Sequence, residues 1–267
     1  MNFGKQVRLS RILNPQTGKA FFATLDHGLA RGVLPGIENV KTLLEKLVEG
    51  EPEALTMHKG LAKEFYLPYA SRVSLVLKAS SFSPFHQNLD VPIADVDEAI
   101  SLGADALSIG VITGGRDQPK MLEALGRISK DCEEKGMPLI AHIYPKGELI
   151  KDEERYSVEQ ISYAVRMGVE CGVDIIKTWY TGSYDTFLKV MDSSHGRVVI
   201  AGGPKTDEIG SFFKMTYDAI RAGAIGVAYG RNIWQYHNPA LMIKALRAVI
   251  HEGEKPDNAM KILNEVG

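Results

Sequence analysis

One short phrase recurs along this chain and limits the folds open to it. It reads GADALSIG at residues 103–110, GVDIIKTW at 172–179 and GAIGVAYG at 223–230. The leading glycine is typical of the residue after a helix, where the backbone turns left-handed. The apolar run that follows is typical of a parallel strand covered on both faces. Each copy therefore predicts the end of a helix, a buried strand and a loop.

Apolar runs of this kind predict eight strands. They lie at Phe21–Leu25, Ala54–Met57, Ser74–Lys78, Ala106–Ile109, Leu139–Ile143, Asp174–Lys177, Val198–Ala201 and Gly226–Ala228. Amphipathic segments between most of them predict helices. These occupy Ile37–Gly50, Asp95–Leu102, Pro119–Lys135, Ser157–Cys171, Tyr184–Ser194, Asp207–Ala222 and Pro239–His251. Ser157, with Gln160 three residues later, forms a capping-box pattern.

Eight strand–helix units predict a TIM barrel, an α/β fold that uses about 250 residues as one domain. We therefore expect a single barrel domain over residues 1–267. An open doubly wound sheet is the alternative, but it usually has fewer strands, and no GxGxxG follows the first run. The third unit is the weakest, because Glu64–Ser71 is a poor helix and Ser80–Pro92 reads as a long loop.

The charge and cysteine content argue against several classes of function. Lys and Arg total 31 and Asp and Glu total 33, so the net charge is −2, which gives nucleic-acid or membrane-surface binding little support. Cys132 and Cys171 match no metal-ligand spacing. No apolar run approaches the roughly 20 residues that span a bilayer, and the amino terminus has no apolar signal core. We expect a cytoplasmic enzyme.

Polar residues concentrate where the predicted strands end. In a TIM barrel the active site lies at the carboxyl ends of the strands, so these residues are expected to meet. They are Asp26–His27–Gly28, His58–Lys59–Gly60, Lys78, Tyr144–Pro145–Lys146–Gly147, Lys177–Thr178, Gly202–Gly203–Pro204–Lys205 and Gly230–Arg231–Asn232. Their shared position is stronger evidence for a site than any one of them.

Lys177 interrupts the apolar run that begins at Val173. Burial of an ammonium is unfavourable, so the pKa of this amine is expected to fall. A neutral amine is a nucleophile that forms Schiff bases with carbonyl compounds. The alternative is a lysine that extends from a strand end to solvent, and the spacing alone leaves both open.

Glycines follow the seventh and eighth strands. TIM barrels commonly bind a phosphate there through exposed backbone N–H groups. The candidates are Gly202, Gly203 and Gly230, with Arg231 and Lys205 adding positive charge. The alternative is two ordinary tight turns.

Tyr144 and Asp26 are candidate acid–base groups that face a shared cavity. A packed tyrosine and a loop-capping aspartate are the alternatives. His27, His58 and His142 form a competing set, because three imidazoles can bind a catalytic zinc ion. No HExxH or similarly dense cluster supports this set, so no metal is expected.

The same residues carry a resemblance to a known family. The matching pieces are LDHGLARG, MHKG, IYPKG, DIIKTWYTG, VVIAGGPKT and AGAIGVAYGRNIWQ. The chain resembles the archaeal-type class I fructose-bisphosphate aldolases from about residue 7 to residue 251. That family includes the 2-amino-3,7-dideoxy-threo-hept-6-ulosonate synthases and the autoinducer-processing thiolases. The resemblance implies a TIM barrel, commonly decameric, that uses a lysine Schiff base and no other cofactor.

The resemblance also implies roles for individual residues. Lys177 corresponds to the Schiff-base lysine, Tyr144 to the proton-transfer tyrosine and Asp26 to an acid–base or orienting aspartate. The two glycine loops correspond to those that hold the substrate phosphate, through Gly202, Gly203, Gly230 and Arg231.

Departures from the family lie at the substrate end of the site. Arg31 stands where the bisphosphate aldolases usually have histidine, His142 where they tend to have tryptophan, and Lys146 where they have arginine. The synthase motif DHGxxNGP is absent too, and the presence of Tyr144 argues against the thiolases. We expect these three altered residues, with His27 and Lys205, to contact substrate. A second phosphate is open to Arg31, Lys59, Lys78 or Lys146.

Three functions stay open. The first is a class I aldolase that acts on a phosphorylated ketose, like fructose-1,6-bisphosphate, with dihydroxyacetone phosphate as one fragment. The second is a bond-forming synthase that joins a sugar-phosphate fragment to an amino-acid-derived aldehyde. The third is a non-catalytic barrel that binds sugar phosphates. The resemblance implies a homo-oligomer.

Overall fold

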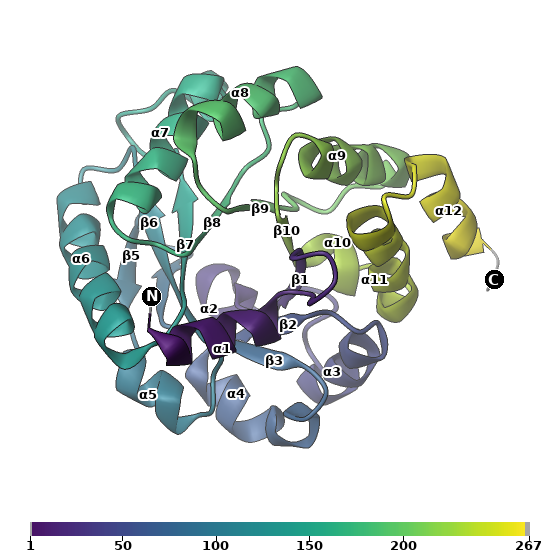
Figure 1. Cartoon of the computed structure of the whole chain (residues 1–267), viewed down its shortest axis with the longest axis horizontal. Coiled ribbons are helices and arrows are strands. Elements are labelled where there is room, and N and C mark those ends of the chain that lie inside the picture. Colours follow the sequence, from purple (N-terminus) through teal and green to yellow (C-terminus); the bar gives the residue numbers. More distant parts are fainter. Residues whose placement is uncertain (1, 265–267) are drawn as a thin grey trace.

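A computed structural model describes residues 2–264 and contains a closed barrel of eight parallel strands (Figure 1). The strands are β1 (Ala20–Thr24), β2 (Ala54–Met57), β3 (Ser74–Lys78), β6 (Ala106–Ile112), β7 (Leu139–Tyr144), β8 (Ile175–Thr178), β9 (Val198–Ala201) and β10 (Gly226–Tyr229). They pair in the order β1-β10-β9-β8-β7-β6-β3-β2. The predicted TIM barrel is confirmed. The expected domain also includes residues 1 and 265–267, which lie outside the described residues.

The chain also forms helices, most of which cover the outside of the barrel (Figure 1). They are α2 (His27–Arg31), α3 (Val40–Glu49), α4 (Lys59–Phe65), α5 (Val96–Ser101), α6 (Gln118–Lys135), α7 (Val158–Glu170), α8 (Tyr184–Ser194), α9 (Ile209–Arg221), α10 (Arg231–Trp234), α11 (Pro239–Arg247) and α12 (Pro256–Asn264). The Ser157 hydroxyl accepts a hydrogen bond from the Gln160 N–H, as its capping pattern predicts. Within residues 2–264, no helix is long and apolar enough to cross a membrane.

The prediction of a long loop over Ser80–Pro92 is wrong. The segment is an antiparallel hairpin of β4 (Ser80–Ser83) and β5 (His86–Pro92). Both strands of the hairpin are largely polar. The sequence therefore lacks the apolar pattern from which strands are predicted. The expectation that Glu64–Ser71 is a poor helix is confirmed, because α4 ends at Phe65 and only a 3-10 turn follows at Leu67–Tyr69.

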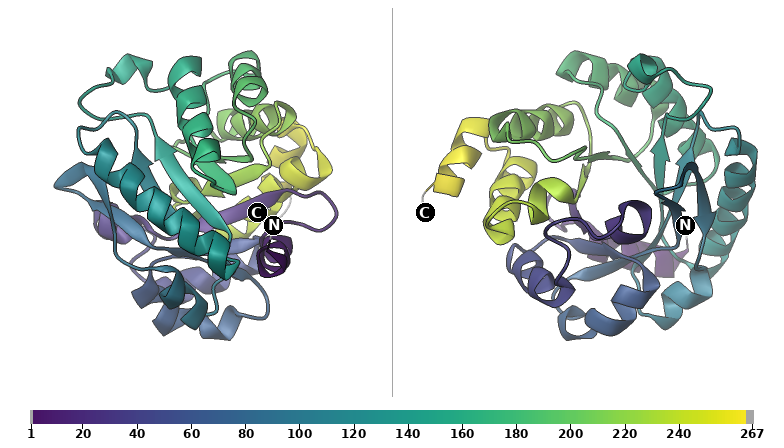
Figure 2. Two further views of the ribbon diagram at one scale, coloured as in Figure 1. Left: turned by 60° about the vertical axis from the view of Figure 1, so that its left-hand side comes forward. Right: turned by 180° about the vertical axis from the view of Figure 1, so that it is seen from behind.

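Helix α1 (Phe3–Ile12) closes the amino end of the barrel. It crosses in front of the strands in Figure 1, and the right-hand view of Figure 2 shows the opposite end. Leu9 and Ile12 pack into the apolar cluster inside the barrel. The buried Lys5 on the same helix pairs with Glu133 at 2.6 Å and with Asp174 at 2.9 Å. Both apolar and ionic contacts therefore hold α1 in place.

Strand alternation fixes where polar side chains enter the barrel. Every strand contributes to the apolar cluster inside the barrel, and β1 also adds Ala20 at its amino end. The residues in question are Phe22, Ala54, Val76, Ala106, Ile140, Ile175, Val199 and Ala228. Successive residues of a strand face opposite sides, so the next inward positions lie two residues further along. We call this set the upper ring: Thr24, Thr56, Lys78, Ser108, His142, Lys177, Ala201 and Gly230. The upper ring therefore forms the floor of any cavity at the carboxyl end of the barrel.

Candidate active site

A cavity of about 310 Å³ opens above the upper ring at the carboxyl ends of the strands. It collects nearly all of the site residues predicted from the sequence. Those that line it are Asp26, His27, Arg31, His142, Tyr144, Lys146, Lys177, Gly202, Gly203, Gly230 and Arg231. Of the residues left open for a second phosphate, Arg31, Lys78 and Lys146 line the cavity, whereas Lys59 lies outside its lining and pairs with Glu98.

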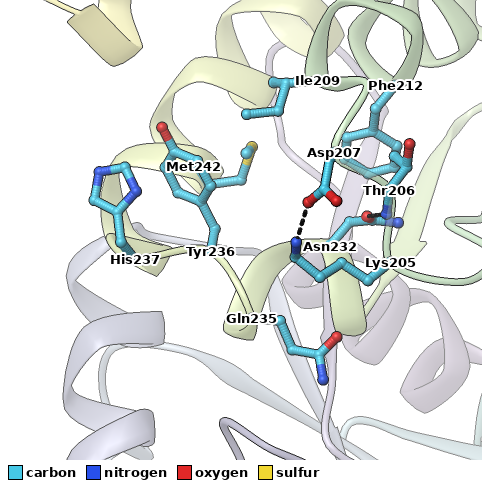
Figure 3. A pocket seen from close by; sticks show the side chains of 10 residues that line it. All are labelled: Lys205, Thr206, Asp207, Ile209, Phe212, Asn232, Gln235, Tyr236, His237 and Met242. Carbon is cyan, nitrogen blue, oxygen red and sulfur yellow. Dashed lines mark hydrogen bonds and ion pairs between the residues drawn. The ribbon is translucent and has the colours of Figure 1, made fainter.

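Lys205 is the predicted site residue that the structure does not bring to this cavity. It lines a neighbouring hollow between α9, α10 and α11, where its amine pairs with Asp207 (Figure 3). The loop after β9 therefore presents its glycines to the cavity and its lysine to the other side. Sequence position alone could not separate these two faces.

Lys177 lies on β8 in the upper ring and is 5% exposed. Among residues 2–264 its amine has no hydrogen bond or ion pair. Burial lowers the pKa of Lys177, and the positive charges of Lys78 and Arg231 lower it further, whereas Asp26 acts in the opposite direction. The net fall favours the neutral, nucleophilic form of the amine.

Asp26 lies between two histidines at the end of β1. Its carboxylate oxygens are 3.4 Å from His27 Nδ1 and 3.8 Å from His142 Nδ1. Burial would raise the pKa of Asp26, but Lys177 and the other nearby positive groups lower it to below its usual range. Burial lowers the pKa of His27 to about 4 and that of His142 well below its ordinary value. At neutral pH the site therefore holds a carboxylate beside two neutral imidazoles.

Tyr144 projects from the end of β7 into the cavity. Its ring packs against Trp179 with ring centroids 4.9 Å apart, and Tyr156 packs on Trp179 at the same distance. Burial raises the pKa of Tyr144, and the nearby Asp26 carboxylate raises it further. The phenol therefore keeps its proton at neutral pH and can donate it to a reacting atom.

The two glycine loops form one wall of the cavity. A Cβ on residue 230 would lie 2.4 Å from the His27 ring, so only glycine lets these elements approach. Arg231 Nε is buried, and no residue of the described chain hydrogen-bonds to it. A wall of glycine loops beside an unpaired guanidinium is suited to hold an anion.

Asn232 joins the two loops through its side-chain amide, a role that its position in the sequence does not indicate. Its Nδ2 donates to the carbonyls of Gly202 and Pro204, at 2.8 and 2.9 Å, and its Oδ1 accepts from the Thr206 N–H. The motif that contains it was visible in the sequence, but nothing there showed which carbonyls its side chain reaches.

Cations gather around Phe82 at the mouth of the cavity. The amine of Lys146 lies 4.4 Å from the centre of that ring and the guanidinium of Arg31 lies 5.7 Å from it. Arg155 lines the same part of the cavity. Burial, together with the charges of Arg31 and Arg155, lowers the pKa of Lys146 to about 8.

His27, His58 and His142, considered above as zinc ligands, do not form a metal-binding group in the part of the chain that the structure describes. Within the chain from residue 2 to residue 264, no group of three or more His, Cys, Asp and Glu side chains is arranged to hold a metal ion. His58 instead contacts the Lys78 carbonyl through its Nδ1 at 2.9 Å.

Comparison with known proteins defines the class of protein. The DeoC/LacD family aldolase profile matches residues 20–236, which is most of the barrel. The chain belongs to the DeoC/LacD aldolase family.

The individual relatives include both kinds of enzyme that the sequence resembles, a synthase and a bisphosphate aldolase. The chain is 34% identical over 261 residues to 2-amino-3,7-dideoxy-D-threo-hept-6-ulosonate synthase 1 of Archaeoglobus fulgidus, covering 97% of this chain and 95% of that one. A crystal structure of an archaeal fructose 1,6-bisphosphate aldolase superposes with a TM-score of 0.85 at 28% identity, covering 93% of this chain and all of that one.

A third similar structure is that of an archaeal fructose-1,6-bisphosphate aldolase whose catalytic lysine is covalently bound to the carbinolamine intermediate. Its TM-score is 0.84 at 27% identity, and the match covers 92% of this chain and 99% of that one. Aldolase chemistry on a lysine is thus established among the structural neighbours of this barrel.

Proposed function

We propose that this aldolase works through a Schiff base on Lys177 and acts on a phosphorylated ketose, as a fructose-1,6-bisphosphate aldolase does. The observation that carries the proposal is the placement of Lys177, a buried amine with a lowered pKa at the floor of the cavity. A neighbouring structure with a lysine-bound carbinolamine supports the same chemistry.

The chemistry follows from three side chains that line the cavity, Lys177, Asp26 and Tyr144. Lys177 attacks the ketone carbon, and loss of water gives an iminium. The iminium accepts the electron pair of the adjacent C–C bond, so cleavage leaves an enamine and a free aldehyde. Asp26 assists carbinolamine formation and dehydration, and Tyr144 exchanges protons with the reacting oxygen.

The charges around the cavity favour a substrate with two anionic groups. Two carboxylates line it, Asp26 and Asp90, against five cationic side chains besides the Lys177 amine. The cationic side chains are Arg31, Lys78, Lys146, Arg155 and Arg231. We place one phosphate on the glycine loops with Arg231 and the second anionic group near Arg31 and Lys146. This arrangement suits a ketose bisphosphate with dihydroxyacetone phosphate as the fragment bound to the lysine.

Borohydride trapping tests this function. Incubation with dihydroxyacetone phosphate and sodium borohydride should reduce the imine and add one fragment to Lys177, seen by mass spectrometry. The Lys177→Ala variant should give no adduct, while Lys59→Ala should react like the parent because Lys59 lies outside the cavity lining. An adduct that persists in Lys177→Ala would overturn the assignment. A parent enzyme that binds the phosphate without forming an imine would favour the non-catalytic barrel.

A second candidate is the bond-forming synthase. The 34% identical relative from Archaeoglobus fulgidus favours it, as do the altered residues Arg31 and His142 at the substrate end. Incubation of the enzyme and dihydroxyacetone phosphate with glyceraldehyde 3-phosphate or with aspartate semialdehyde separates the two functions. The aldehyde that is consumed identifies the branch.

The protein is further proposed to act in the cytoplasm as a homo-oligomer, with a decamer as the expected assembly. Large apolar side chains at the surface support association, among them Phe3, Leu67, Phe85 and Leu149. Light scattering of the purified protein after size-exclusion chromatography measures the number of subunits.

A further inference from the structure

The upper ring contains a second lysine that the proposed reaction has not used. Lys78, from β3, is 5% exposed and lines the same cavity as Lys177. Its amine donates a hydrogen bond to Ser80 Oγ at 2.8 Å and lies 3.7 Å from Asp90 Oδ1. Two amines and two carboxylates, Asp26 and Asp90, thus share one buried chamber.

The surroundings of Lys78 are built by the hairpin that the sequence did not reveal. Ser80 begins β4 and Asp90 lies on β5, so the hairpin delivers both partners of the amine. Gly110 on β6 makes room for them, because a Cβ there would lie 2.1 Å from Asp90 Oδ2. The Gly110 N–H also donates to Ser80 Oγ at 2.7 Å, which fixes the hydroxyl.

Stability does not account for this arrangement. A buried ion pair is often no more stabilising than apolar residues of similar volume. The pair is also incomplete, because 3.7 Å is too long for a hydrogen bond and Asp90 Oδ1 is buried with no hydrogen-bond partner in the described chain. An ammonium with unused N–H groups at the floor of a substrate cavity is suited to bind a substrate oxygen.

We propose that Lys78 is a second catalytic lysine, whose ammonium donates a hydrogen bond to the aldehyde oxygen at the carbon where the C–C bond forms or breaks. This proposal rests on the Schiff-base reaction at Lys177. In the direction of synthesis, the enamine carbon attacks the aldehyde carbon and the new C–C bond forms. The carbonyl π pair moves to oxygen, which takes the proton of Tyr144, and the enamine nitrogen becomes the iminium.

In this step Lys78 transfers no proton. Its fixed positive charge stabilises the negative charge that develops on the aldehyde oxygen, as preorganised donors do at other oxyanions. Asp90 and Ser80 are positioning residues that hold the amine toward the oxygen. The two lysines thereby divide the work, since Lys177 binds the ketone carbon and Lys78 contacts the oxygen of the other fragment.

Partial reactions test this division. Borohydride trapping and exchange of the dihydroxyacetone phosphate C3 proton with solvent both pass through the Lys177 imine, and neither involves an aldehyde. In Lys78→Met, both should fall by less than about tenfold, because loss of the Lys78 charge raises the pKa of Lys177, while kcat for cleavage of fructose 1,6-bisphosphate should fall about a hundredfold. Asp90→Asn should lower kcat less, and Lys78→Arg should recover part of the loss. Lys59→Met, a lysine outside the cavity lining, is the matched control and should change neither readout.

Two results would overturn the proposal. One is normal cleavage by Lys78→Met, and the other is an equal loss of trapping, exchange and cleavage in a variant whose thermal unfolding matches the parent. A crystal structure of the unaltered protein with the bisphosphate adds a test that needs no variant. Lys78 Nζ should lie about 3 Å from the C4 oxygen, and a distance beyond hydrogen bonding would contradict the role. A parent enzyme that forms no imine at all would instead overturn the Schiff-base function itself.

Discussion

The two ends of the barrel treat a buried lysine in opposite ways. At the amino end, Lys5 is 2% exposed and contacts two carboxylates within 2.9 Å. Burial lowers its pKa, but its hydrogen bonds to Glu133 and Asp174 raise the net pKa above the ordinary value. At the carboxyl end, Lys177 is equally buried without such partners, and its pKa falls.

This difference separates charged residues that stabilise the fold from charged residues whose polar groups are left free to contact a ligand. The amino end satisfies its charges internally, and Glu53 there likewise binds Arg247 and the Phe21 N–H. The carboxyl end leaves polar groups incompletely paired, as Lys177, Asp90 and Arg231 show. Substitutions at the amino end should therefore lower the free energy of unfolding, and substitutions at the carboxyl end should lower catalytic activity.

The largest expected effect is that of Lys177→Met. It should lower aldolase activity by at least about a thousandfold, because the substitution removes the proposed nucleophile. It should also raise the free energy of unfolding by about 1 kcal/mol. The sign follows from the lowered pKa: at neutral pH a proton binds more tightly to the unfolded chain, so the lysine opposes folding. Urea denaturation measures the free energy of unfolding. A less stable Lys177→Met variant would contradict the proposed difference between the two ends of the barrel.

Lys5→Met should have the reverse pattern. Its removal leaves Asp174, which also accepts the Leu139 N–H, without its buried partner, and should cost about 3 kcal/mol of unfolding free energy. The kcat of the remaining folded protein should stay that of the parent. Lys130→Met is the control, since its exposed pair with Glu134 contributes at most about 0.5 kcal/mol.

Asn232→Ala probes the wall between the glycine loops. Loss of its three hydrogen bonds should raise the KM for a phosphorylated substrate about tenfold with a smaller change in kcat, because it loosens binding rather than chemistry. Asn238→Ala removes the cap of α11 and should cost about 1 kcal/mol of stability with no change in KM. Equal KM values for the two variants would show that the loops do not hold the phosphate.

The smallest effect is a pH dependence at the cavity mouth. Because the pKa of Lys146 falls to about 8, its ammonium is lost as the pH rises through that value. The KM for an anionic substrate should then rise about fourfold between pH 7 and pH 8.5. Lys146→Arg keeps its charge and should flatten the profile. A profile that is unchanged by this substitution would place the second anionic group elsewhere.

The fold was largely predictable because its strands are buried on both faces. The strands Ala54–Met57, Ser74–Lys78 and Val198–Ala201 have the bounds that their apolar runs predict. Helix α1 escaped prediction, since its polar sequence hides the two residues that enter the barrel, Leu9 and Ile12. The periodicity of apolar residues predicts the strands and outer helices, but it misses a helix that contributes only a few apolar contacts.

The site was predictable where it depends on strand ends and not where it depends on inserted segments. Asp26, Tyr144 and Lys177 follow or end apolar runs, so their meeting in one cavity follows from the barrel itself. Asp90 lies in a segment read as a loop, so nothing placed it beside Lys78. Lys205 failed for a related reason, because one loop presents successive residues to two different hollows.

The helix across the amino end has a consequence for the order of product release. With α1 packed into the barrel interior, the ketose and its fragments share the entrance at the carboxyl end. In the proposed reaction the fragment attached to Lys177 leaves only after hydrolysis of its imine, so the free aldehyde departs first. Product inhibition should accordingly be competitive for dihydroxyacetone phosphate and noncompetitive for the aldehyde.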